Sequence, residues 1–117
     1  MDAQQVNFAV AEESVGAVSV VSVTGAIDML TAPQLAEAIR AALAKQPSAV
    51  VVNLTEVDFL ASAGMQVLVA ANEEAGGTRL VVAAEGPATS RPLKITGITD
   101  FIDVFATLDE ALENDTV

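Results

Sequence analysis

The chain has 117 residues, enough for one domain with a single hydrophobic core and too few for two. Hydrophobic residues make up 52% of it, but only four residues are aromatic, all phenylalanine, so the core is expected to consist of aliphatic side chains. Sixteen acidic and five basic residues give a net charge of −11, which disfavours direct binding to nucleic acids and to anionic membranes.

The sequence contains neither cysteine nor histidine. This excludes disulfide bonds, thiolate metal sites, the common zinc sites and the Ser-His and Cys-His nucleophile pairs. Residues 1–10 have no basic start, and no segment approaches the roughly 18 consecutive apolar residues of a membrane span. We therefore expect a cytoplasmic protein that is not an enzyme and that needs no metal or other cofactor.

Two strands are predicted near the N-terminus, over residues 6–12 and 17–25, with a polar hairpin connection over residues 12–16. The second strand changes its alternation midway, with Val18 and Val20 in one phase and Val21 and Val23 in the other. A strand with apolar residues in both phases is expected inside a sheet that is covered on both faces.

A first helix is predicted to begin at Thr31. Thr31 is placed to act as its N-cap, with Gln34 as the partner in a capping box and Pro33 in the first turn. Leu30 and Leu35 have the spacing of a hydrophobic staple. Apolar residues then recur at helical spacing, at positions 35, 39 and 43.

The later elements alternate between strand and helix. Strands are predicted over residues 49–54, 78–84 and 101–105, and helices over residues 63–75, between Pro87 and Gly97, and over residues 107–113. This alternation implies right-handed crossovers. We therefore predict an α/β fold of one domain over residues 1–117, with a mixed, mostly parallel sheet of about five strands and about four helices.

Functional loops of such sheets lie beyond the C-terminal ends of the strands. Two predicted loops qualify, residues 24–31 after the second strand and residues 55–62 after the third. If these strands are neighbours, Asp28 and Ser62 lie close together at one end of the sheet.

Ser62 lies between two alanines at the start of the predicted helix over residues 63–75. Serine is a preferred N-cap residue, so we expect it to cap this helix. A helix N-terminus also accommodates a phosphate, because its free N–H groups and its dipole favour negative charge. Phosphorylation of Ser62 would therefore leave the fold intact and change what docks there.

The helix after Ser62 has a mixed face. At helical spacing Ser62 shares a stripe with Gln66, Val69 and Glu73, with Met65 beside it, whereas positions 67, 68 and 71 point toward the sheet. Two interpretations of Met65 and Val69 are open, a partner-binding surface and the edge of the buried core.

Gly64 weakens the first turn of this helix by about 1 kcal/mol relative to alanine. Close approach of another backbone would explain a glycine at this position.

Several segments together resemble the STAS domain of bacterial anti-sigma factor antagonists: "GAID" at residues 25–28, "VVNLTEVDFLASAG" at residues 51–64 and "FATLDEAL" at residues 105–112. The most specific part is Asn53 and Leu54, a spacer, Phe59, and then Ser62 and Gly64. Family members often have Asp-Ser-Ser-Gly at this point, whereas this chain has alanine on both sides of Ser62.

The resemblance implies a function. In that family an anti-sigma factor that is itself an ATP-dependent serine kinase phosphorylates the serine at the position of Ser62. The unphosphorylated antagonist binds the anti-sigma factor and frees a sigma factor for transcription, the phosphorylated form does not bind, and a phosphatase restores it. The resemblance also implies that Asp28 contacts the partner. We expect a monomer whose partner-binding residues are Asp28, Ser62, Gly64, Met65, Gln66 and Val69.

Three other functions remain open. A phosphoryl-transfer enzyme would need Asp28, Asp58 and Asp103 to converge with a cation at one site. A receiver-like domain phosphorylated on Asp58 would need acidic residues just after its first strand, where residues 11–14 are the candidates. A regulatory module that binds a nucleotide or a lipid would use the loop over residues 85–92, with Arg91, to accept an anionic group.

Overall fold

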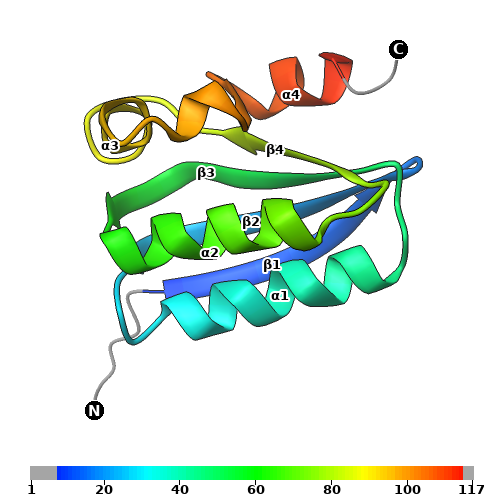
Figure 1. The fold of residues 1–117 in the computed structure, drawn as a ribbon, viewed down its shortest axis with the longest axis horizontal. Coiled ribbons are helices and arrows are strands. Elements are labelled where there is room, and N and C mark those ends of the chain that lie inside the picture. Colours follow the sequence, from blue (N-terminus) through cyan, green and yellow to red (C-terminus); the bar gives the residue numbers. More distant parts are fainter. Residues whose placement is uncertain (1–7, 115–117) are drawn as a thin grey trace.

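The computed structural model describes residues 8–114 of the chain. The strands of this part are β1 (Phe8–Val15), β2 (Val18–Ile27), β3 (Ala49–Leu60), β4 (Arg79–Ala83) and β5 (Asp103–Phe105). The helices are α1 (Ala32–Ala44), α2 (Ser62–Glu74), α3 (Ser90–Ile95) and α4 (Leu108–Asn114), with a short 3₁₀ helix, η1 (Ile98–Asp100). The sheet order is β1-β2-β3-β4-β5, and only the β1–β2 pair is antiparallel within these residues. The predicted α/β fold with a mixed, mostly parallel sheet is confirmed (Figure 1).

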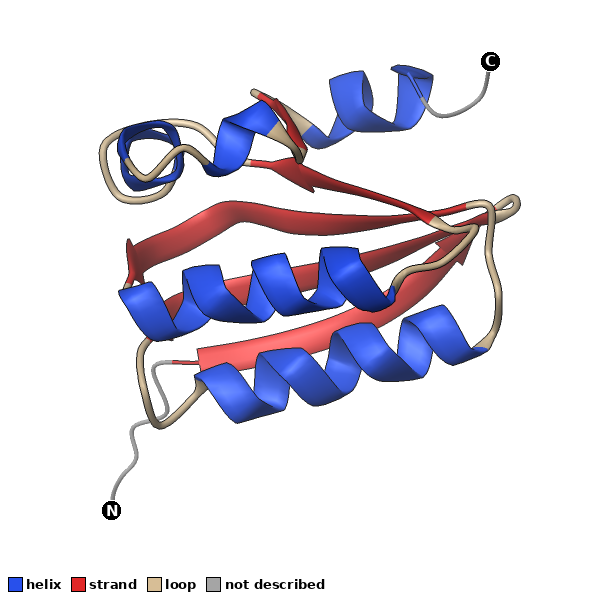
Figure 2. Cartoon of the chain, viewed as in Figure 1, coloured by secondary structure: helices blue, strands red, loops and turns tan. Residues whose placement is uncertain are grey.

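Helices cover the sheet on both faces. α1 and α2 lie along one face, and α4 lies on the opposite side (Figures 1 and 2). The buried cluster under α1 and α2 includes Val21 and Val50, and a second cluster under α4 includes Val20 and Val51. The change of alternation in β2 therefore has the predicted cause, because its successive valines point into two different cores.

The hairpin between β1 and β2 is tighter than predicted. The strands are joined at residues 16 and 17, where Gly16 has φ +62°. The predicted connection over residues 12–16 is wrong because Glu12 is part of the β1 ladder. Its carboxylate accepts hydrogen bonds from Ser19 Oγ at 2.7 Å and from Lys45 Nζ at 3.0 Å, which hold the glutamate inside the strand. Residues 6 and 7 of the predicted strand lie outside the described residues.

β2 and β3 both run past their predicted ends. They stay paired in parallel up to Ile27 and Leu60, with two shifts in register on the way. The predicted loops are therefore wrong for residues 24–27 and 55–60, which are strand, whereas residues 28–31 form a loop as predicted. Val57 and Leu60 remain buried, with 7% and 5% of their surface exposed. The register shifts break the period of two that identifies a strand in the sequence, so the polar residues there resembled a loop.

α1 begins where predicted, with Thr31 at the N-cap position and Pro33 in the first turn, but it lacks the predicted cap bonds. Thr31 has near-helical backbone angles, φ −96° and ψ −18°, and makes no side-chain cap bond, so the capping box with Gln34 is wrong. The hydrophobic staple is also wrong, because Leu30 is 83% exposed while Leu35 is fully buried. The predicted apolar face is confirmed: Leu35 and Ile39 are buried and Leu43 packs against the same core.

The remaining elements agree with the predictions apart from their ends. α2 and α4 each lie within one residue of the predicted bounds, and β4 and β5 fall inside the predicted strands. The segment between Pro87 and Gly97 forms only the six residues of α3. Among residues 8–114 we find no helix long and apolar enough to cross a membrane.

Candidate functional site

The C-terminal ends of β2 and β3 bring two segments to one end of the sheet. Ile27 pairs with Leu60, and the Ala61 N–H donates a hydrogen bond to the Ile27 carbonyl oxygen at 2.9 Å. Asp28 follows directly on one chain segment and Ser62 on the other. In Figure 1 the loop before α1 and the start of α2 lie at the same end of the molecule. The expectation that the two residues share this end is confirmed.

Asp28 organises the loop that it begins. Its Oδ1 accepts hydrogen bonds from the N–H groups of Leu30 at 2.9 Å and Thr31 at 3.0 Å. The Asp28 N–H in turn donates to Thr31 Oγ1 at 2.8 Å, and the Asp28 carbonyl accepts the Ala32 N–H at 2.8 Å. The bond from the Thr31 backbone, followed by that from Leu30, lowers the pKa of Asp28. The carboxylate is therefore ionised at neutral pH and fixes the turn that leads into α1.

Ser62 is the first residue of α2 and does not cap it. The N-cap is Ala61, with extended backbone angles of φ −83° and ψ 168°, and no side chain caps this helix. The prediction of a serine cap is wrong because the helix begins one residue earlier than the sequence suggested. Ser62 is exposed, and its hydroxyl makes no hydrogen bond within residues 8–114. That hydroxyl is therefore not engaged by the part of the chain that the structure describes.

Gly64 sits in the first turn of α2 and faces inward. A Cβ at this position would lie 2.6 Å from Ile27 Cγ2 and 2.7 Å from Leu60 Cδ1. The expected approach of another backbone is therefore wrong, because buried side chains of β2 and β3 fill the space. Gly64 is itself buried, so it sets the position of α2 and offers no surface of its own.

The outer face of α2 has the mixed character predicted for it. Gln66 is exposed, while Met65 and Val69 are half-buried and pack against the edge of the core. Leu68 points inward as expected. Val67 differs, because it is half-buried and faces α1 rather than lying under α2.

Three exposed apolar residues at this end were not predicted: Met29 (77% exposed), Leu30 (83%) and Ile95 (75%). We call these three residues the apolar rim. Met29 and Leu30 lie in the loop that Asp28 organises. Ile95 ends α3 next to Thr96, whose Oγ1 lies 3.6 Å from Met65 Sδ. The rim therefore flanks the start of α2 on two sides.

The sequence offered one clue to the rim, an apolar pair within a short loop after a strand. The predicted staple instead pairs Leu30 with Leu35. Ile95 gave no clue, because a helix of six residues is too short for its buried phase to be determined from the sequence.

The carboxylates proposed for enzymatic chemistry do not converge. Asp103 lies at the start of β5, where it pairs with Arg79, while Asp28 follows the far end of β2. Asp58 is exposed on β3, and residues 11–14 lie at the opposite end of the sheet beside the start of β2. Among residues 8–114 no group of three or more carboxylates is placed to hold a metal ion. Asp28, Asp58 and Asp103 therefore do not form a single site.

Comparison with known proteins identifies the class. The sequence model of the STAS domain family matches residues 9–111 of the chain. The chain belongs to the STAS domain family, as its fold and the exposed serine at the start of α2 had indicated.

Within that family the chain is similar to anti-sigma factor antagonists. It is 40% identical to the anti-sigma-F factor antagonist RsfB of Mycobacterium tuberculosis over 96 residues, 81% of this chain and 79% of that protein. The crystal structure of an anti-sigma factor antagonist from Mycobacterium paratuberculosis matches with a TM-score of 0.91 and 43% identity, covering 94% of this chain and 95% of that one. The phosphorylated form of the Bacillus cell fate determinant SpoIIAA shares the fold, with a TM-score of 0.67 and 19% identity over 91% of this chain and 98% of that one.

Proposed function

We propose that this protein is an anti-sigma factor antagonist controlled by phosphorylation of Ser62. The unphosphorylated chain binds an anti-sigma factor that is also a serine kinase, and thereby frees a sigma factor for transcription. The kinase transfers the γ-phosphoryl group of ATP to Ser62 Oγ, which loses its proton, and ADP leaves. A phosphatase hydrolyses the phosphoserine and restores binding.

The observation that carries this proposal is the free hydroxyl of Ser62 on the first residue of a 13-residue helix. The first N–H groups of a helix have no intrahelical partner, and the helix dipole favours negative charge there. A phosphate on Ser62 therefore meets a favourable field and displaces no existing hydrogen bond. Phosphorylation at this point adds charge to the surface without disturbing the core.

The docking surface that we propose consists of Asp28, Ser62, Met65, Gln66 and Val69 together with the apolar rim. Ser62 lies among apolar side chains that a partner would cover. A doubly charged phosphate there would have to lose water without a compensating cation, which is strongly unfavourable. Asp28 contributes by holding Met29 and Leu30 in place, and Gly64 by fixing the start of α2.

The net charge of −11 disfavours nucleic acid as the partner. Together with the scattered carboxylates and the lack of histidine and cysteine, it supports a cytoplasmic monomer that acts by binding, without catalytic turnover and without contact to nucleic acid. The relatives named above support the assignment of the partner as an anti-sigma factor.

A displacement assay tests this function. Each sigma and anti-sigma pair encoded in the same genome is purified as a complex and mixed with the unphosphorylated chain. We expect one sigma factor to be released in proportion to the amount of chain added. A Met65→Lys, Val69→Lys variant should fail to release it, whereas Glu113→Lys on α4 should behave as wild type. If no sigma factor is released by the wild-type chain, the proposed function is wrong.

A further inference from the structure

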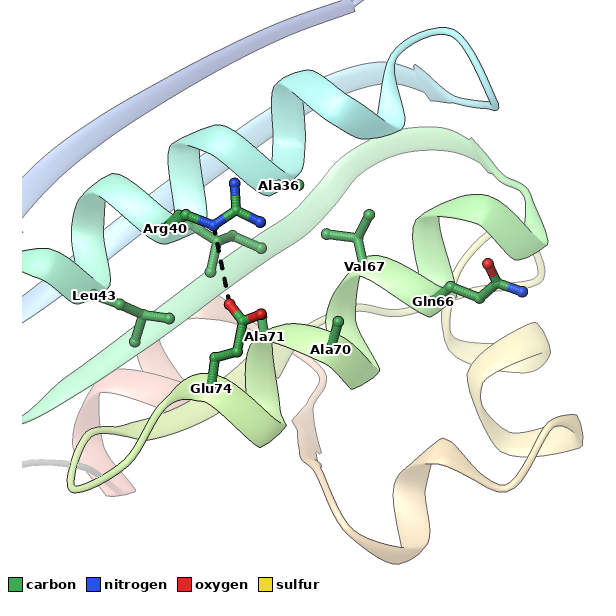
Figure 3. Close-up of a pocket in the computed structure, with 9 residues that line it drawn as sticks. Ala36, Arg40, Leu43, Gln66, Val67, Ala70, Ala71 and Glu74 are labelled. Carbon is green, nitrogen blue, oxygen red and sulfur yellow. Dashed lines mark ion pairs between the residues drawn. The ribbon is translucent and has the colours of Figure 1, made fainter.

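A groove runs between the two helices that cover one face of the sheet. Figure 3 shows its walls, with α1 on one side and α2 on the other. The groove has a volume of about 190 Å³ and is lined by residues of both helices, among them Ala36, Ile39, Leu43, Gln66, Val67 and Ala70. Most of these side chains are apolar.

Small side chains keep the groove open. Ala36 on α1 and Ala70 on α2 both line it, and neither has atoms beyond Cβ to fill the space between the helices. Helices normally pack with the side chains of one seated between those of the other. Here no side chain fills the space between the helices on the solvent side, so the apolar walls face water. Covering them with a partner would be favourable.

The edge of the groove carries an ion pair that is easily broken. Arg40 Nε and Glu74 Oε1 lie 3.9 Å apart across it, with 66% and 58% of their side-chain surface exposed. An exposed ion pair of this length contributes little to stability. Protein interfaces often bind an anchor side chain in an apolar pocket with polar residues at its edge.

Three points favour a partner's side chain as the occupant of the groove. Small-molecule sites usually measure about 300–1,000 Å³, so a volume of about 190 Å³ suits a single side chain rather than a free ligand. Gln66 lines the groove and also belongs to the docking surface, so the two are continuous. A typical interface buries about 800 Å² per partner, a patch roughly 30 Å across, whereas α2 is only about 20 Å long. An interface centred on α2 would therefore extend beyond this helix and over the groove.

We infer that the anti-sigma factor that covers Ser62 also inserts one aliphatic or aromatic side chain into the α1–α2 groove. This inference rests on the proposed function and adds a second contact to it. Ala70 lies two helical turns from Ser62, about 12 Å along the axis. Changes that far apart usually have additive effects. The groove therefore sets the affinity of the complex, while Ser62 alone provides the switch.

Filling the groove tests the inference. Ala70 is exposed, and leucine has nearly the helix propensity of alanine, so Ala70→Leu should occupy the space without unfolding α2. Ala41→Leu is the matched control, because Ala41 is an exposed alanine of α1 that does not line the groove. Both variants and the wild-type chain are titrated by calorimetry with the anti-sigma factor found in the displacement assay, and their melting temperatures are compared.

We expect Ala70→Leu to bind at least tenfold more weakly than Ala41→Leu while the two melt within a few degrees of each other. The same ratio should appear when Ser62→Asp is added to both variants. Affinity of Ala70→Leu within twofold of the control would overturn the inference. The wild-type chain separates the two proposals: if it binds in its unphosphorylated form only, the proposed function stands whatever the groove variants do.

Discussion

At the scale of single residues, substitutions of Ser62 are expected to change partner binding and protein stability independently. Because this hydroxyl makes no cap bond, Ser62→Ala should change the free energy of unfolding by less than about 0.5 kcal/mol, as exposed substitutions usually do. A true N-cap would cost about 1 kcal/mol. The variant should also keep its affinity for the anti-sigma factor after incubation with ATP, which thermal unfolding and titration check together. Loss of binding in Ser62→Ala before any ATP is added would contradict this.

Ser62→Asp should behave in the opposite way. A carboxylate in the first turn of α2 interacts favourably with the helix dipole, so stability should stay equal or rise by up to about 1 kcal/mol. Binding should weaken, because the charge must be desolvated under the partner. The same two measurements apply, and a variant that is less stable but binds normally would mean that the two effects are assigned the wrong way round.

Asp28 is expected to act through the shape of its loop. Asp28→Ala removes the oxygen that accepts the N–H groups of Leu30 and Thr31, so Met29 and Leu30 should lose their fixed position and anti-sigma affinity should fall. Asp28→Asn keeps an acceptor oxygen and should retain most of the affinity. Titration of both variants decides the matter: if the asparagine variant binds as weakly as the alanine variant, the charge itself contacts the partner.

The residues that sequence reasoning placed correctly are those fixed by topology. Asp28 and Ser62 each follow a strand, and neighbouring parallel strands end together. The cap role of Ser62 was wrong by one residue, because the hydrogen bond from Ala61 to Ile27 sets where α2 begins and that bond depends on the tertiary fold. The exposure of Leu30 and Ile95 likewise depends on what neighbouring elements leave uncovered, which no local pattern shows.

Among the elements, the packing of α2 on the ends of β2 and β3 depends on Gly64. Gly64→Ala gains helix propensity of about 1 kcal/mol, but its new methyl group overlaps Ile27 and Leu60, which are buried and cannot move freely. Overpacking of this kind costs roughly 1–3 kcal/mol, so we expect a net loss of stability and a lower melting temperature. Ala63→Gly on the same turn serves as a comparison. A higher melting temperature for Gly64→Ala would show that the packing there is looser than the distances indicate.

Glu12 links β1 to β2 and α1 in a way that depends on pH. The hydrogen bond from Ser19, followed by that from Lys45, lowers the pKa of Glu12 below its ordinary value of 4.5. The ionised form is thus favoured by folding, so its contribution to stability is present above the unfolded pKa and is lost as the pH falls through the lower folded value.

Glu12→Gln should therefore destabilise the protein at pH 7, with a difference from wild type that shrinks steadily below about pH 4.5. Urea unfolding at several pH values measures this difference. Glu13→Gln, on the exposed neighbouring residue, has the same change in net charge and is the charge-matched control. A Glu12→Gln penalty that stays constant down to pH 3 would mean that the ionised carboxylate is not the stabilising species.

For the whole molecule, the order and type of the elements could be predicted because the alternating apolar strands and helices admit few topologies. The ends of the strands were harder to predict, because the register shifts in β3 interrupt the alternation of buried and exposed residues. The α1–α2 groove could not be predicted at all. Its walls come from Ala36 and Ala70, far apart in the sequence, and the gap depends on how two helices settle on one sheet.

The central claim is that a phosphate on Ser62 abolishes binding while leaving the fold unchanged. The most direct test compares the unmodified chain with a chain carrying phosphoserine at position 62 in calorimetric titrations with the same anti-sigma factor, after thermal unfolding of both. An uncompensated buried charge costs about 3–5 kcal/mol, so the phosphorylated chain should bind at least about a hundredfold more weakly and melt within a few degrees of the unmodified one. Equal affinities of the two chains would contradict the account.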